Sequence, residues 1–271
     1  LFCSGLLLAF YRLLLVRKVS FRACRRYLVA AVFLSAVIPA LDIPLYPART
    51  VVYPLPLIAA PPAENFVQTT GELPVAVPVV PSGWRRILRP MAVGGYLTAL
   101  FLSLGFLAVR MVGIRRLRRR SRLTDCGAYT LAEHPQIATP FSFLRTVFLG
   151  GGYEGRRRMI VLCHEAGHVR HRHSAERIAV ELVRSLFWFN PFVWIAGRWL
   201  QEVHEWEADR DVLDAGYDLT EYRTVIFHQL FGHNPDIACG LNHSLTQKRF
   251  AMMTQFRKRR FAVLRLGGAL P

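Results

Sequence analysis

The sequence predicts a mainly helical protein that crosses a membrane several times and carries a mostly helical, cytoplasm-facing domain with a small β element. First, 52% of its 271 residues are hydrophobic although its net charge is +17, a combination typical of apolar spans flanked by arginine-rich loops. Second, Met91–Val109 contains nineteen residues without a charge, close to the length of about 20 residues that a spanning helix needs. Third, the chain beyond residue 150 reads as several helices separated by turn residues.

Three apolar segments precede residue 115, and they place spans near residues 1–16, 27–44 and 91–113. Residues 1–113 would then form a transmembrane region. The two shorter segments have a competing interpretation as buried core helices, because each is less than a full membrane thickness in apolar length.

Clusters of arginine orient these spans. One cluster follows the first span at residues 17–26, and another follows the third at residues 115–122. Basic clusters stay on the cytoplasmic side, so the loop of about residues 45–88 lies outside and residues 114–258 form a cytoplasm-facing domain. Arg85, Arg86 and Arg89 are exceptions on the outer side.

The two ends of the chain indicate an excised fragment of a longer protein, because the first residue is Leu1 and lies inside an apolar run. Residues 259–271 turn apolar after a basic cluster and predict the start of a further span. The five cysteines are odd in number and form no C-x-x-C pair, so neither a disulfide framework nor a thiolate zinc site is indicated.

Within the domain, short strands are expected near Ala128–Ala132 and Phe143–Leu149, where β-branched and aromatic residues gather. A glycine run then breaks the chain. Helices are expected at Glu154–His171, from an N-cap at Ser174 to Phe189, from Pro191 behind the cap Asn190 to Ala215, and from Thr220 to Phe231.

The string His164-Glu165-Ala166-Gly167-His168 contains the pattern H-E-x-x-H. On a helix, positions i and i+4 share one face, so both imidazoles can bind one Zn²⁺. Glu165 follows the first ligand and can act as general base towards a metal-bound water. The alternative is a solvated charged face, since further basic residues follow directly.

A catalytic zinc needs a third protein ligand and one open position. The stretch 202–209 is the expected source, because a turn between helices brings it back beside the motif. Spacing alone leaves the choice open among Glu202, His204, Glu205, Glu207 and Asp209. Glu205 and Asp209 share a helix face, which would let Glu205 bind the metal while Asp209 orients a ligand histidine.

Several neighbouring residues carry a simpler expectation. A solvated helix face is expected for Glu202, Glu207 and Asp211, and a basic surface for His171 and His173.

The motif, the segment Trp188–Trp194 and the segment Glu205–Asp209 together resemble the BlaR/MecR antirepressor peptidase family, and more distantly the HtpX/Ste24-type membrane peptidases. The resemblance implies transmembrane helices around a cytoplasm-facing zinc peptidase domain with one zinc per chain and Glu205 as third ligand. The chain departs from the family at His173, where Asp is common. No S-x-x-K motif of a penicillin sensor follows, so β-lactam sensing is not implied.

The expected function is that of a zinc metalloendopeptidase of the inner, cytoplasmic membrane. It would cleave a cytoplasmic regulator such as a transcriptional repressor, or its own chain. The alternative is a non-catalytic, zinc-binding membrane signal transducer.

A nucleic-acid binder is a third possibility, because basic residues gather near the end of the chain: Lys248, Arg249, Arg257, Lys258, Arg259 and Arg260. Attraction to anionic lipid explains this cluster more simply. The expected partners are therefore a protein substrate and the lipid bilayer, with no direct nucleic-acid contact.

Overall fold

The computed structural model describes residues 2–16, 19–38, 83–231 and 245–255. The chain divides into two compact units, one that combines residues 1–40 with 99–271 and one of residues 41–98. The predicted outer loop lies almost entirely outside the described residues, and the further span expected at 259–271 lies wholly outside them.

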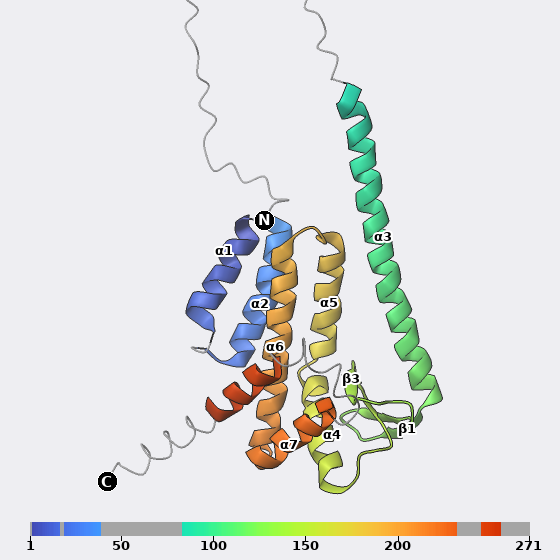
Figure 1. Ribbon diagram of the computed structural model, residues 1–271, viewed down its shortest axis with the longest axis vertical. Coiled ribbons are helices and arrows are strands. Elements are labelled where there is room, and N and C mark those ends of the chain that lie inside the picture. The colour runs from blue at the N-terminus through green and yellow to red at the C-terminus, as the bar shows by residue number, and fades with distance from the viewer. Residues whose placement is uncertain (1, 17–18, 39–82, 232–244, 256–271) are drawn as a thin grey trace, which may run out of the picture. The chain divides into compact units, whose positions relative to one another are not determined.

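Two N-terminal helices pack against the domain that carries the H-E-x-x-H motif (Figure 1). Helix α1 (Phe2–Phe10) continues into a short π-helix, η1 (Tyr11–Leu15), and α2 (Phe21–Val37) follows. These elements share a buried apolar core with α5 (His173–Leu186) and α6 (Pro191–Asp214). The first two predicted spans are thus joined to the motif domain in one unit, as far as their residues are described.

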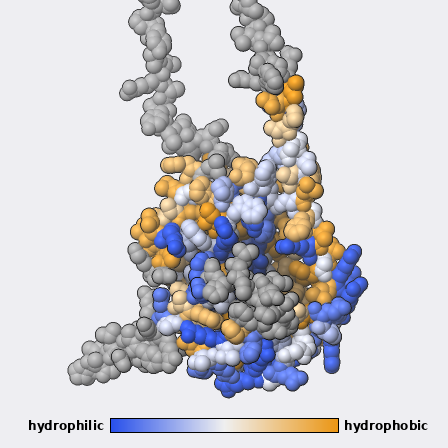
Figure 2. Space-filling model, in the orientation of Figure 1, coloured by the Kyte–Doolittle hydropathy of each residue, from blue (hydrophilic) through white to orange (hydrophobic). Residues whose placement is uncertain are grey.

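Helix α3 (Gly83–Arg120) is long, and most of its apolar side chains are exposed. Among the described residues, Ile87–Arg120 is the one segment with the length and hydropathy to cross a membrane, while the apolar Phe2–Leu15 is shorter. Figure 2 shows hydrophobic residues on the outer side of α1 and on the upper part of α3, and hydrophilic residues around the arginine-rich lower end of α3. One candidate span is therefore present, and the multi-span arrangement stays a prediction.

The small β element is a four-stranded sheet with the order β1-β2-β4-β3. Strands β1 (Arg122–Asp125) and β2 (Thr130–Glu133) are antiparallel, β2 runs parallel to β4 (Thr146–Leu149), and β3 (Phe141–Phe143) is antiparallel to β4. The sequence analysis predicted only two strands here. It missed β1, and it assigned the hairpin of β3 and β4 to a single strand at 143–149. Leu144 adopts a positive φ of 51° and turns the chain between β3 and β4.

The remaining helices surround α6. Helix α4 (Gly155–Arg170), α7 (Leu219–Phe231) and a helix at residues 245–255 share a second core with α6. The predicted cap Asn190 is confirmed, since its Oδ1 accepts a hydrogen bond from the Phe192 amide at 3.0 Å.

Two predicted N-caps are wrong. Helix α5 begins at His173, one residue before the expected cap Ser174. Helix α7 is capped by the Asp218 carboxylate, which accepts from the Thr220 and Glu221 amides, and not by Thr220.

Candidate metal centre

Helices α4 and α6 approach each other closely at a glycine. Gly167 of α4 faces α6, and a Cβ at this position would stand 3.4 Å from the Cα of Ala208 on α6. A larger residue would therefore push the helices apart. The close approach brings Glu205 of α6 beside both motif histidines of α4.

Three predicted ligands meet at this point. His164 Nε2 lies 3.6 Å from one oxygen of Glu205, His168 Nε2 lies 3.7 Å from the other, and the two nitrogens are 3.3 Å apart. One donor atom from each residue falls within 4.8 Å of the others. Donors about 2 Å from a tetrahedral ion are spaced by roughly 3.3 Å, so two imidazoles and one carboxylate fit zinc with an open fourth position.

The predicted base lies on the same helix as the histidines. Glu165 is buried, and its burial raises the pKa of its carboxyl, an effect that the charges of His164 and a side-chain hydrogen bond with Ser142 partly offset. A carboxylate with a raised pKa accepts a proton more readily. Ser142 belongs to β3, so the base faces an edge strand of the sheet.

His164 is held on its other ring nitrogen by a tyrosine that the sequence analysis did not single out. The Tyr222 hydroxyl lies 2.8 Å from His164 Nδ1 and donates to Asp209 Oδ1 at 2.6 Å. Asp209 itself is 3.5 Å from the same nitrogen. The structure thus places Asp209 next to the ligand histidine, with Tyr222 linking the two groups.

Arg249, on the helix at 245–255, was expected on a lipid-facing basic surface, and this expectation is wrong. Its Nη1 lies 3.1 Å from Glu205 Oε2, and its Nη2 and Nε contact the two oxygens of Asp209 at 2.5 and 3.0 Å. Burial by itself would raise the pKa of Glu205, but the guanidinium and the neighbouring histidines hold that pKa well below its usual range. Glu205 therefore remains ionised.

His168 is held by a buried chain of polar side chains. Its Nδ1 lies 2.8 Å from His173 Nδ1, and His173 Nε2 lies 3.2 Å from Glu207 Oε2. Glu207 in turn accepts from Arg25 of α2 at 2.9 Å. Burial lowers the pKa of His168 to about 3 and shifts that of His173 in the same direction. Both rings are therefore neutral at pH 7.

The positions of these buried side chains correct two expectations from the sequence. His173, predicted on a basic surface, is 1% exposed, and Glu207, predicted on a solvated face, is 4% exposed. The reason is that α2 and α5 pack against the side of α6 that the sequence analysis expected to face solvent. His171 and Asp211 are half-buried and pair with each other at 2.9 Å.

The remaining ligand candidates do not reach the donor cluster. Glu202 forms an ion pair with the exposed Lys248. The ring of His204 stacks on His173 with centroids 4.0 Å apart, and its Nε2 lies 2.8 Å from Glu176. Spacing within α6 explains the selection, because only one face of the helix points to α4.

Sequence reasoning missed Tyr222, Arg249 and Arg25 because none belongs to a local motif. Arg249 carried a weak signal, since an arginine directly before Phe250 and two methionines, Met252 and Met253, fits a helix with one buried face.

Together these features define a helical domain with the donor set and buried carboxylate of a metallopeptidase. A comparison with protein families agrees: the BlaR1 peptidase M56 family matches residues 14–253. The chain belongs to this family, which confirms the resemblance stated above and implies metallopeptidase-type activity. No curated protein matches the chain.

Proposed function

We propose that the protein is a zinc-dependent endopeptidase of the cytoplasmic membrane, with its active site on the cytoplasmic side. Its substrate would be a cytoplasmic regulator such as a transcriptional repressor, or its own chain. The observation that carries this proposal is the meeting of His164, His168 and Glu205 with donor spacings that suit zinc, directly beside a buried Glu165.

Each residue has a distinct part in this proposal. His164, His168 and Glu205 would hold zinc, which when bound supplies a Lewis acid that makes water a nucleophile at neutral pH. Glu165 would accept a proton from the attacking water and return it to the leaving amine. Among the described strands β3 lies at the edge of the sheet. An edge strand can pair with an extended peptide through its backbone groups, which supports this proposal.

The first test measures the metal content of the detergent-purified chain by elemental analysis. We expect about one zinc per chain in the wild type and in Glu165→Gln, and little in His164→Ala or Glu205→Ala, because a catalytic site keeps three protein ligands. Cleavage of a randomised fluorogenic peptide mixture and of the chain itself, read by mass spectrometry, should disappear in Glu165→Gln.

Two outcomes would redirect the proposal. Zinc without any cleavage would favour the alternative of a non-catalytic membrane transducer. Cleavage that survives Glu165→Gln would sink the assigned base.

A further inference from the structure

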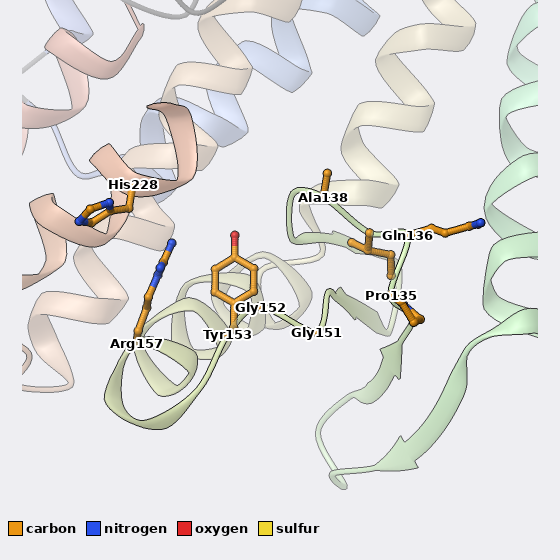
Figure 3. A pocket seen from close by; sticks show the side chains of 9 residues that line it. Pro135, Gln136, Ala138, Gly151, Gly152, Tyr153, Arg157 and His228 are labelled. Atoms are coloured by element: carbon orange, nitrogen blue, oxygen red, sulfur yellow. The ribbon is translucent and has the colours of Figure 1, made fainter. Parts of the chain in front are cut away.

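A second feature of the molecule is a pocket of about 500 Å³ beside the start of α4. It is lined by the loop at residues 135–138, the turn at 151–153, Arg157 of α4 and His228 of α7. In Figure 3 the side chains of Arg157 and Tyr153 extend in the same direction, with His228 on one side and Ala138 on the other. Among the described residues that line it, none is acidic.

Arg157 is the middle one of three consecutive arginines, and it differs from its neighbours. Arg156 pairs with Glu221 at 2.7 Å, and Arg158 pairs with Glu133 at 2.7 Å. No carboxylate in the described part of the chain pairs with Arg157, and its Nε is buried without a hydrogen-bond partner. Its guanidinium lies over the Tyr153 ring at 5.1 Å.

Tyr153 provides a second unsatisfied group. The residue is 5% exposed, and its hydroxyl has no partner in hydrogen-bonding geometry among the described residues, although Gln229 lies nearby. A buried polar group without a partner is costly and calls for an explanation. The pocket therefore contains one cation and one hydroxyl that are ready for an acceptor.

The shape of the pocket is built into the fold. Gly150 lies against the loop at 135–138, and a Cβ at this position would overlap the carbonyl oxygen of Ile137 at 2.0 Å. This contact joins the loop to the turn that begins α4. Arg157 and Glu165 both belong to α4, and two helical turns separate them, which is about 12 Å along the helix axis.

We propose that this pocket is a substrate subsite that binds an acidic side chain of the peptide, with Arg157 as its counter-ion and Tyr153 as a hydrogen-bond donor. The inference rests on the proposed function and names a preference of the same active site. A carboxylate is the chemistry that satisfies a guanidinium and a hydroxyl together. The volume is large enough to hold neighbouring peptide residues as well.

The test measures binding by the full chain carrying Glu165→Gln, which should retain zinc and leave peptides uncut. The probes are two labelled, otherwise randomised decapeptide mixtures, one with Glu and one with Gln fixed at the centre. Fluorescence anisotropy should show about threefold tighter binding of the Glu mixture, the effect expected of one partly exposed ion pair.

The three arginines supply matched variants on this background. Arg157→Gln should abolish the preference for Glu, and Arg157→Lys should keep part of it. Arg156→Gln and Arg158→Gln should leave it unchanged, because each removes one positive charge outside the pocket. Zinc content and thermal melting of every variant verify its folding.

The inference fails if the wild-type pocket shows no preference for the Glu mixture, or if Arg157→Gln keeps it. It fails equally if Arg156→Gln removes it, since surface charge would then be the cause. Binding preference is read without cleavage, so it is separate from failure of the proposed peptidase activity. In an active chain, cleaved products should show an acidic residue at one constant distance from the cut.

Discussion

At the scale of single residues, Arg249 balances the charge of the metal centre. Glu205 and Asp209 stand one helical turn apart on α6, and both are largely removed from solvent. Two neighbouring carboxylates repel each other, and burial makes each charge costly. The guanidinium contacts both carboxylates and compensates their charges, which lets Glu205 stay ionised, as its proposed role as a metal ligand requires.

Arg249→Gln should therefore destabilise the zinc-free protein by about 3 kcal/mol, because it leaves buried carboxylates without their counter-ion. Denaturant unfolding in a chelator, followed by tryptophan fluorescence, measures this loss. Added zinc should restore part of it, because the metal then compensates Glu205.

The matched control is the neighbouring Lys248→Gln, which removes an exposed ion pair with Glu202 and should cost less than about 1 kcal/mol. Equal losses in the two variants would contradict the role assigned to Arg249.

At the scale of elements, the distance between α4 and α6 decides whether the ligands meet. Gly167 is a point of close approach, where a Cβ would also stand 3.1 Å from Asp211 Oδ2. The same two helices carry all three proposed metal ligands, so a small separation here displaces Glu205 from both histidines.

Gly167→Ala should lower zinc affinity about tenfold, since overpacking a tight helix contact typically costs more than the gain in helix propensity. Competition with a fluorescent zinc chelator gives the affinity. Gly197→Ala on α6 is the control, because its Cβ would make an ordinary 3.5 Å contact with Val180. An unchanged affinity in Gly167→Ala would show that the helices can separate without moving the ligands.

A second relation between elements links α2 to the metal centre. Arg25 donates a hydrogen bond to Glu207. Glu207 also contacts Nε2 of His173, and Nδ1 of His173 contacts Nδ1 of His168. If zinc binds Nε2 of His168, its Nδ1 carries the proton and donates to His173, so His173 must donate from its own Nε2 to Glu207. In this arrangement the charge of Arg25 on α2 would help to orient the proposed ligand His168 on α4.

Arg25→Gln should weaken zinc binding about tenfold, the lower end of the effect of removing an outer partner of a metal ligand. The same chelator competition measures it. Arg26→Gln is the matched control, because Arg26 is exposed and its Nε donates only to the backbone of its own helix. If both variants bind zinc as the wild type does, α2 has no influence on the ligand.

At the scale of the whole molecule, α3 is the segment that a membrane would accommodate. Its apolar part is exposed over its length, and it ends in Arg118, Arg119 and Arg120. Basic residues at the end of a span mark the cytoplasmic side. On this rule we predict that the sheet and the candidate metal centre, which follow α3 in the chain, face the cytoplasm.

The exposed Cys126 just after β1 allows this orientation to be measured. In a variant that keeps Cys126 as its only cysteine, an impermeant maleimide should label inverted membrane vesicles and leave right-side-out vesicles unlabelled. The reverse pattern would overturn the cytoplasmic placement. Detergent-opened vesicles, which should label fully, serve as the control.

Local patterns in the sequence determined much of this protein. The spacing of His164, Glu165 and His168 needs only one helix, and Asn190 followed by Pro191 marks a helix start by itself. The family resemblance pointed to Glu205, which spacing alone had left among five candidates. The long uncharged run at Met91–Val109 lies within α3, the single candidate span among the described residues.

The tertiary structure alone decided the surroundings of the metal centre. Arg249 is 40 residues from Asp209 in the chain, and Arg25 is 182 residues from Glu207. Neither pairing leaves a periodic signal, because a charged residue on a helix reads as solvent-facing until another helix covers it. Burial of His173 and Glu207 follows from that covering, which depends on packing between helices and is absent from any local pattern.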